Sequence, residues 1–258
     1  MSQLFFATTA RSATGLVRKG NEDSAFTSPR VIAVADGMGG HAAGEVASRI
    51  AITKLAEISE VITHPDIDTE SAEDLFSSAL HSIDLEIKSE ADENSQLSGM
   101  GTTLTALFAI EEKISLMHIG DSRAYRLRGS SLEQLSLDHT VIQELLNQGA
   151  ISETDIATHP QRSVLTQVLM GEGIASAPLL ILDGKINDRY LLCSDGLSSV
   201  LSDKEIKSLI KAKDRQQAVD ALIDATYING APDNVTVIIA DLVDENSENV
   251  SQKIGAAQ

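Results

Sequence analysis

The sequence predicts an α+β domain in which antiparallel sheets are layered with helices. Apolar strand-like runs gather in three zones of the chain, and amphipathic helical stripes fill the intervals between them. A doubly wound parallel fold needs strands and helices that alternate one by one, so this block order favours antiparallel layers. A chain of 258 residues is long enough to bury the core of one large domain or two small ones.

The expected strands are short apolar runs that end at an acidic residue or a glycine. They lie in Leu4–Ala10, Val31–Ala35, Thr103–Arg128, Tyr190–Cys193 and Val235–Leu242. The third of these ranges is too long for one strand. Its charged residues at 111–113 and its glycine at position 120 divide it into successive strands.

Two adjacent amphipathic helices are expected between the second and third of these ranges. Their apolar stripes are Val46, Ile50, Leu55, Ile58 and Ile62, followed by Phe76, Leu80, Ile83 and Ile87. The segment 63–66 separates the two helices because its proline ends a helix, and residues 66–69 offer caps for the next one. Residues 202–205 form a capping box before a later helix, and residues 218–228 predict a final one.

Two segments break this pattern. Residues 138–171 combine short helical pieces with polar punctuation, which predicts a loop-rich insertion. Residues 244–258 are polar and have no hydrophobic period, so we expect a disordered tail or the start of a linker. The folded domain is therefore expected to span residues 1–243.

The charge balance excludes several kinds of partner. The chain has 20 basic and 38 acidic residues, a net charge of −18 and an isoelectric point near 4.6, whereas nucleic acids and anionic membranes attract basic surfaces. A single cysteine suits a reducing compartment. No run approaches the roughly 20 apolar residues of a membrane span, and residues 1–20 lack the core of a signal peptide. We expect a cytoplasmic protein.

Four aspartates fall next to strands, and they are the most informative residues of the sequence. Asp36, Asp121 and Asp195 follow apolar runs, and Asp233 comes just before one. Asp36 and Asp195 directly precede a glycine, and any one such pair taken alone is equally compatible with an ordinary turn. Carboxylates at rigid strand ends can instead converge into a cluster of oxygen ligands, which suits hard divalent cations. Four such aspartates in one chain favour a metal site over separate turns.

Three competing motifs fail on inspection. Residues 15–20 have the glycine spacing of a phosphate-binding P-loop, but the lysine and the hydroxyl residue that should follow are missing. Residues 37–42 match a dinucleotide-binding fingerprint, yet Asp36 would lie beside the pyrophosphate. Cys193 has Ser199 where a cysteine-dependent phosphatase needs an arginine.

Six segments, taken in order, resemble the bacterial branch of the metal-dependent serine/threonine phosphatases of the protein phosphatase 2C type. They are Gly15–Ser24, Val34–His41, Gly99–Thr103, His118–Arg123, Leu192–Leu197 and Asp233–Val237. The resemblance runs from about residue 15 to residue 241. It implies a four-layer α-β-β-α sandwich, with two antiparallel sheets flanked by helix pairs, and it makes residues 138–171 a mobile flap on the catalytic domain.

The resemblance also implies a set of metal ligands. By position, Asp36 bridges two Mn²⁺ or Mg²⁺ ions, Gly37 offers its carbonyl to one ion, and Asp195 and Asp233 hold the other. Asp121, together with Asp195, matches the acids that bind a third, weaker ion. Two ions ~3.5–4 Å apart lower the pKa of a shared water from ~15.7 toward ~7, which makes hydroxide available for in-line attack on phosphorus.

Other positions carry supporting roles in this resemblance. Arg18 is expected to grip the phosphoryl oxygens, because a guanidinium can hold two of them at once. Glu22 and Asp23 are expected to orient metal-bound waters. Asn234 is expected to fix the loop that carries Asp233 through local bonds from its side chain to the backbone.

The general acid is the point where this sequence departs from the pattern. Eukaryotic relatives carry a histidine directly after the Asp-Gly pair, but Met38 stands there in this chain. His41 is the candidate for protonating the leaving alkoxide. Two alternatives stay open: His41 shapes the substrate groove, or a metal-bound water supplies the proton.

These features together predict an enzyme that hydrolyses phosphoserine and phosphothreonine in proteins and opposes serine/threonine kinases. Its partners would be phosphoproteins, including such kinases, and the chain would be a monomer. One alternative is a catalytically weak signalling module that binds a partner protein. A second is a binding module whose acids hold structural Ca²⁺. The polar tail also allows a longer parent chain that anchors this domain at the inner face of a membrane.

Overall fold

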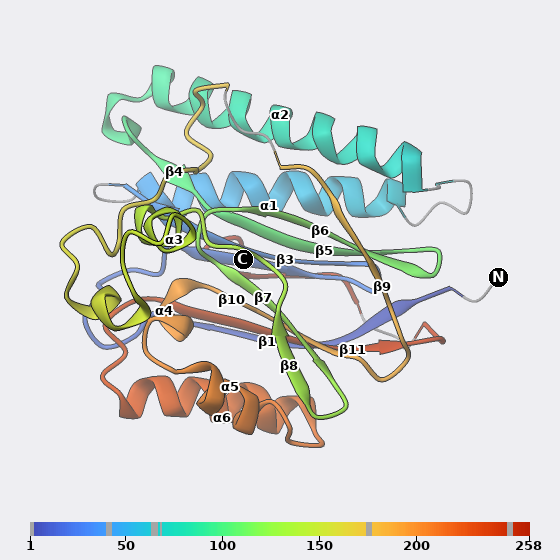
Figure 1. The fold of residues 1–258 in the computed structure, drawn as a ribbon. Coiled ribbons are helices and arrows are strands. Elements are labelled where there is room, and N and C mark those ends of the chain that lie inside the picture. The colour runs from blue at the N-terminus through green and yellow to red at the C-terminus, as the bar shows by residue number, and fades with distance from the viewer. Residues whose placement is uncertain (1–2, 40–42, 63–66, 68, 174–176, 247–249) are drawn as a thin grey trace.

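The computed structural model describes residues 3–39, 43–62, 67, 69–173, 177–246 and 250–258. Figure 1 shows four layers in the order helix, sheet, sheet, helix. The first layer consists of α1 (Ala43–Ile62) and α2 (Thr69–Glu93). The last consists of α5 (Asp203–Leu209) and α6 (Arg215–Ile228), with the short α4 (Asp195–Ser198) at its edge. The predicted α+β sandwich is confirmed.

Both sheets are antiparallel in every described pairing. The sheet next to α1 has the order β12 (Gln252–Gly255), β2 (Asp23–Thr27), β3 (Val31–Met38), β5 (Leu104–Ile110), β6 (Lys113–Ile119) and β9 (Leu180–Asp183), with β4 (Gly101–Thr102) also beside β3. The sheet next to α6 has the order β1 (Phe5–Ala13), β11 (Val235–Val243), β10 (Arg189–Cys193), β7 (Arg123–Arg128) and β8 (Ser131–Gln134).

Three apolar clusters fill the three spaces between the four layers. The cluster between the sheets includes Phe6, Ile32, Leu107, Tyr190 and Ile238, all fully buried. A second cluster packs the stripes of α1 and α2 onto their sheet, and a third packs α6 onto the other. Continuous apolar burial on both sides of a sheet explains why these strands read as apolar runs and show no alternation.

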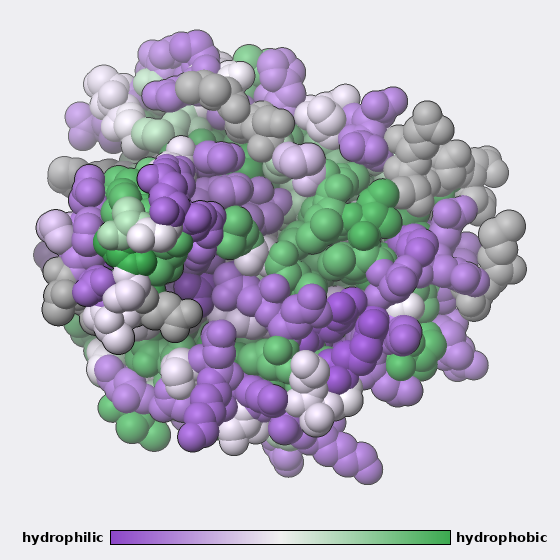
Figure 2. Space-filling model, viewed as in Figure 1, coloured by the Kyte–Doolittle hydropathy of each residue, from purple (hydrophilic) through white to green (hydrophobic). Residues whose placement is uncertain are grey.

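The outer surface is mostly hydrophilic in the view of Figure 2, apart from a hydrophobic region over β9. Leu180 and Ile181 of that edge strand are exposed. Within the described residues, none of the helices combines the length and the apolar character that crossing a membrane requires.

The structure corrects the expected tail. Gln252–Gly255 forms β12, which pairs antiparallel with β2, and the side chain of Ile254 is buried against the core between the sheets. A four-residue strand that pairs with an existing sheet edge needs only one buried apolar side chain, so the sequence of β12 shows no hydrophobic period from which a strand could be predicted. The boundary at residue 243 therefore does not separate a folded part from a disordered one. Residues 247–249 lie outside the described part of the chain.

The insertion at residues 138–171, which we call the flap, has little regular structure. It contains α3 (Val141–Asn147) and the 3₁₀ helix η2 (Glu153–Thr158). Figure 1 shows it at the same end of the sandwich as α4. The predicted break between the first two helices, at residues 63–66, lies outside the described residues.

Candidate active site

A cavity of about 630 Å³ opens at one end of the sandwich, where both sheets meet the flap. Its lining residues come from segments far apart in the chain: Arg18, Glu22, Asp36, Gly37, Met38, Gly39, Thr103, Asp121, Ser163, Val164, Leu165, Val168, Met170, Asp195 and Asp233. Every predicted metal-ligand position is in this set, as are Arg18 and Glu22. His41 lies outside the described residues, so the structure says nothing about the predicted general acid.

Asp36 lies near the end of β3 and is held by two hydroxyl residues, Thr102 at the end of β4 and Thr103 between β4 and β5. Its backbone N–H donates to Thr103 Oγ1 over 2.9 Å. Its carbonyl accepts from the Thr103 N–H at 2.9 Å and from Thr102 Oγ1 at 3.0 Å. Thr103 Oγ1 also contacts Ser122 Oγ at 2.8 Å, so the loop of Asp121 is tied to the same point.

Glycine is required after Asp36 and after Asp195 because other backbone lies too close for a side chain. A Cβ on Gly37 would come within 2.0 Å of the Gly44 carbonyl oxygen, and one on Gly196 within 1.9 Å of the Asn234 carbonyl oxygen. These contacts bring α1 and the loop before β11 against the two acidic strand ends. The two glycines are therefore packing points, and neither Asp-Gly pair is a turn, because the first lies within β3 and the second begins α4.

Asn234 ties the Asp233 loop to a distant segment, which differs from its expected local role. Its Nδ2 donates to the carbonyls of Thr14 and Gly20, both at 2.9 Å, and its Oδ1 accepts from the Glu22 N–H at 2.9 Å. All three bonds cross more than 200 positions of sequence. Asn234 therefore holds the loop of residues 14–22, and with it Arg18, beside Asp233.

Arg18 already has an anionic partner in the cavity. Its guanidinium donates to Asp233 Oδ2 at 2.6 Å, and about half of its side chain is exposed. This hydrogen bond raises the pKa of Arg18. Among the described residues that line the cavity, Arg18 is the only cation. It stands where it can bind an incoming anion without leaving the site.

Asp23 lies behind the cavity instead of lining it. It is fully buried, and its Oδ2 accepts from Ser194 Oγ at 2.7 Å. Its Oδ1 has no hydrogen-bond partner among the described residues. Burial is the main reason why its pKa is raised to about 7, and the charges of Asp195 and Asp233 add to this effect.

The carboxylates of the cavity repel one another. Burial, followed by the other aspartates, raises the pKa of Asp36 well above its ordinary value, and burial with Asp195 and Asp138 raises that of Asp121 to about 7. The pKa of Asp195 is also raised, by burial and then by Asp233, although a hydrogen bond with Asp36 acts in the opposite direction. Such a cluster calls for positive charge.

The donor set fits hard divalent cations. The cavity presents carboxylate oxygens and the backbone of Gly37, and Cys193 is buried and does not line it. The orphaned oxygen of Asp23 and the mutual repulsion of the aspartates are both relieved by cations at this place. Among the described residues, no three histidine, cysteine or acidic side chains already enclose one metal-sized point. The aspartates are spread around the open cavity.

The apolar wall of the cavity is the part that the sequence did not reveal. Met38 on one side and Val164, Leu165, Val168 and Met170 on the flap side face the acids. Met38 and Val164 are exposed. In sequence, the flap residues look like fragments of helix core, and nothing in their spacing points to a cavity.

Comparison with known families identifies the fold of this site. The family model for protein phosphatase 2C matches residues 20–229, which contain most of both sheets and three of the four clustered aspartates. The chain belongs to the protein phosphatase 2C family.

Bacterial members of the protein phosphatase 2C family are similar to this chain. The serine/threonine protein phosphatase PstP of Mycobacterium tuberculosis is 41% identical over 238 residues, covering 91% of this chain and 45% of that protein. The chain thus spans about half the length of this curated relative. The serine/threonine phosphatase stp of Listeria monocytogenes is 32% identical over 241 residues, covering 90% of this chain and 94% of that protein.

A solved structure of the catalytic domain of PstP in complex with two manganese ions superimposes with a TM-score of 0.85. It is 38% identical, and the match covers 93% of this chain and 99% of that one. The sandwich of this chain is therefore the catalytic-domain fold of the protein phosphatase 2C family. A relative with this fold holds two Mn²⁺ ions.

Proposed function

We propose that this chain hydrolyses phosphoserine and phosphothreonine in proteins, with divalent metal ions bound in the acidic cavity. The observation that carries the proposal is the convergence of Asp36, Asp121, Asp195 and Asp233 on one cavity that also holds Arg18. This group is assembled from β3, the segment after β6, the start of α4, the loop before β11 and the loop of residues 14–22. The homologues named as serine/threonine protein phosphatases support the same activity.

Different residues around the cavity would bind the metal ions and the phosphoryl group. Asp36, Asp195, Asp233 and the Gly37 carbonyl would hold two Mn²⁺ or Mg²⁺ ions, which lower the pKa of water at the site and offset the negative charge that would repel phosphate. Asp121, together with Asp195, would bind a third ion more weakly.

Arg18 would hold the phosphoryl group, because its guanidinium lies at the cavity and offers several donors. Glu22 lines the same cavity next to it and would accept hydrogen bonds from water, and burial raises its pKa. Asp23 would support this arrangement from behind. His41 remains the candidate that protonates the leaving serine or threonine oxygen.

We infer the biological setting more broadly. Phosphorylated serine/threonine kinases are proposed among the substrates, and a monomer in the cytoplasm is the proposed form. A chain with the net charge of −18 favours protein substrates over nucleic acid. Attachment to a membrane through a longer parent chain is compatible with the length of PstP relative to this match.

The test is release of phosphate from phosphothreonine peptides in the presence of Mn²⁺. Asp36→Asn and Asp195→Asn should each lower the rate by more than about 100-fold, because even residues that only support metal ligands cost 10–100-fold. Asp220→Asn is the matched control, since Asp220 is an exposed partner of Arg11 away from the cavity. Hydrolysis that persists without metal, or unchanged rates in both cavity variants, would contradict the proposal.

A further inference from the structure

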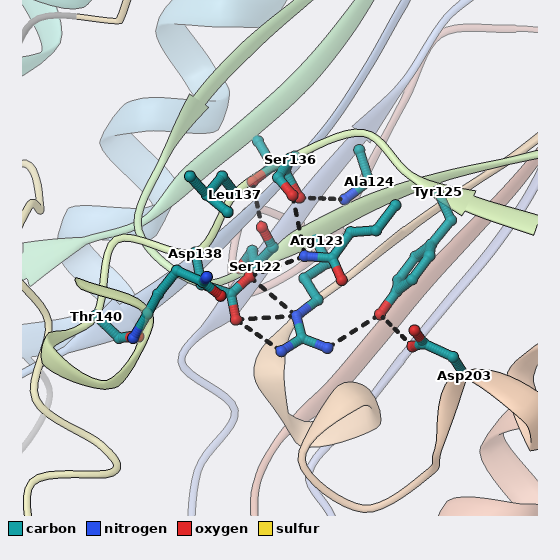
Figure 3. Close-up of polar contacts among 12 residues, drawn as sticks. Ser122, Arg123, Ala124, Tyr125, Ser136, Leu137, Asp138, Thr140 and Asp203 are labelled. Atoms are coloured by element: carbon teal, nitrogen blue, oxygen red, sulfur yellow. Dashed lines mark hydrogen bonds and ion pairs between the residues drawn. The ribbon is translucent and has the colours of Figure 1, made fainter. Parts of the chain in front are cut away.

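A charged pair clamps the entrance of the flap to the strand that follows Asp121. Arg123 at the start of β7 donates three hydrogen bonds to Asp138: from Nε to Oδ1 at 2.9 Å and to Oδ2 at 3.0 Å, and from the terminal nitrogen Nη2 to Oδ2 at 2.7 Å. Figure 3 shows the guanidinium lying against the carboxylate. The Asp138 side chain is only 10% exposed. This fork geometry makes a strong pair.

Neighbouring side chains hold both members of the pair in place. The other terminal nitrogen of Arg123 donates to Tyr125 Oη at 3.2 Å, and Tyr125 Oη in turn donates to Asp203 Oδ1 at 3.2 Å (Figure 3). On the other side, Gln134 Nε2 donates to Asp138 Oδ1 at 3.2 Å. Arg123 is thus held from β7 and, through Tyr125, from the start of α5, whereas Asp138 is also held from β8.

The backbone after Asp138 is tied to the residues around Asp121. The His139 N–H donates to the Gly120 carbonyl at 2.8 Å, and the Gly120 N–H donates back to His139 Nδ1 at 3.2 Å. The two ends of the flap then pair with each other, because Thr140 and Leu165 form a β-bridge and the Val141 N–H donates to the Val164 carbonyl at 3.0 Å. Residues 138–141 and 164–166 form what we call the flap neck.

The flap neck also forms part of the cavity wall. Val164 and Leu165 line the same cavity as Asp121. Any change in how the neck sits on Gly120 therefore moves the apolar wall relative to the acids. Arg123 and Asp138 influence this region electrostatically as well, since the charge of Asp138 raises the pKa of Asp121 and that of Arg123 lowers it.

We propose that Arg123 and Asp138 act as a positioning pair that holds the flap neck beside Asp121 and thereby sets the apolar wall against which a phosphoprotein segment binds. Neither residue lines the cavity, so the pair acts through the neck and not on the substrate. The inference rests on the proposed phosphatase function for its kinetic part only. A phosphopeptide needs the wall, whereas p-nitrophenyl phosphate is small enough to use the acids and Arg18 alone.

Trypsin offers a direct readout of flap position. Arg162 is the only lysine or arginine in residues 138–171 and is exposed, so trypsin can cut the flap at a single place. Asp138→Asn should accelerate cleavage after Arg162 by about tenfold, because loss of one charge-assisted pair corresponds to about that change in the opening equilibrium. Mass spectrometry of the fragments 1–162 and 163–258 identifies the cut. This readout does not depend on phosphatase activity.

The kinetic readout compares two substrates. Asp138→Asn should raise the KM for a phosphothreonine peptide by about tenfold more than the KM for p-nitrophenyl phosphate. Arg123→Lys keeps the charge but loses the fork, and it should fall between the wild type and Asp138→Asn in both readouts. Glu133→Gln is the matched control. It breaks the ion pair at 2.6 Å between Glu133 of β8 and Arg126, which lies on β7 like Arg123 but pairs away from the flap. This variant should change neither the cleavage rate nor the KM values.

Two results would overturn the inference. One is cleavage after Arg162 at the wild-type rate in Asp138→Asn and in Arg123→Lys. The other is an equal rise in KM for both substrates, which would mean general damage to the cavity. If Asp138→Asn does not fold, as judged by its melting temperature, Arg123→Lys alone decides. The two hypotheses can also fail separately. If the wild-type protein releases no phosphate but Asp138→Asn still accelerates cleavage after Arg162, the proposed function is refuted and the positioning pair is not.

Discussion

Under the proposed function, a phosphoryl group and Asp233 would compete for Arg18. The guanidinium bonds Asp233 at 2.6 Å, so a phosphoryl group would have to displace that carboxylate or share the arginine with it. Metal ions on Asp233 would weaken its hold on Arg18, so metal binding and substrate binding would be coupled at this side chain. The resemblance placed Arg18 in the site, but the sequence could not show its partner, because the two residues are 215 positions apart.

We expect Arg18→Lys to raise the KM for a phosphopeptide by about 10–100-fold, since a lysine cannot hold two phosphoryl oxygens in a fixed plane and charge-assisted bonds contribute about 1.5–3 kcal/mol. Steady-state kinetics at saturating Mn²⁺ measure this. Arg11→Lys is the control, because Arg11 forms a comparably exposed pair with Asp220 at 3.1 Å. Equal KM values for Arg18→Lys and the wild type would show that Arg18 does not bind substrate.

Asn234 shows how a local motif can hide a long-range role. Next to Asp233 it reads as a residue that caps its own loop, yet each hydrogen bond of its side chain reaches the segment 14–22. We expect Asn234→Ala to lower the free energy of unfolding by about 2–3 kcal/mol, because three part-buried hydrogen bonds to the backbone are lost. Urea denaturation measures the change. Asn234→Asp keeps the acceptor for the Glu22 N–H and should lose less; a loss under 0.5 kcal/mol in Asn234→Ala, on the order of an exposed substitution, would contradict this role.

At the scale of elements, the sequence predicted those parts that carry their own signal. The stripes of α1 and α2, the runs of β3, β5, β6, β10 and β11, and the capping box of α5 are confirmed. The strands β2, β4, β8, β9 and β12 were missed. β2 begins with Asp23 and Ser24, polar residues that are nevertheless buried, so its hydrophobic pattern is broken. β4 has only two residues, and β8, β9 and β12 are four-residue edge strands.

The capping box at the start of α5 predicts a measurable contribution. Ser202 Oγ accepts from the Glu205 N–H, and the Glu205 carboxylate accepts from the Ser202 N–H at 2.9 Å. We expect Ser202→Ala to lower the free energy of unfolding by about 1 kcal/mol while the phosphatase rate stays the same. Ser208→Ala, an exposed serine of the same helix, is the control. Thermal or urea unfolding measures both variants. Equal free energies of unfolding for Ser202→Ala and Ser208→Ala would contradict the stabilising role of the capping box.

At the scale of the whole molecule, the most consequential property is the excess of negative charge. The chain carries −18 and concentrates several of its buried carboxylates at one end of the sandwich. That arrangement is unfavourable for the metal-free fold. The composition showed the excess of acid, but not that Asp23, Asp36 and Asp195 are placed where burial raises their pKa.

Stability of the metal-free protein should therefore fall as the pH rises. The folded pKa of Asp23 and of Asp121 is raised to about 7, above the ~3.9 of an unfolded aspartate. A raised folded pKa contributes stability that is fully present below the unfolded pKa of ~3.9 and is lost as the pH rises to the folded pKa of about 7. We expect the Tm in chelator to drop mainly between about pH 4 and pH 7, as measured by scanning calorimetry.

Saturating Mn²⁺ should remove or reverse this slope, because cations bind the deprotonated carboxylates and compete with protons. A Tm that follows the same course with pH in chelator and in Mn²⁺ would mean that these acids do not interact with metal. Mn²⁺ should also raise the Tm at about pH 8, and the rise should grow with the logarithm of its free concentration, as expected for a ligand of the folded state.

The two walls of the acidic cavity stand on different sheets: Asp36 lies in β3 of the sheet beside α1, whereas Asp195 follows β10 and Asp233 precedes β11 of the other sheet. The distance between the two walls is thus set by the packing of apolar residues between the sheets, such as Leu107 and Ile238. A shift of one sheet against the other would change this distance without deforming either sheet. Because Mg²⁺ tolerates far less variation in ligand distance than Ca²⁺ does, the rigidity of this apolar layer would help to determine which cation the acidic cavity accepts.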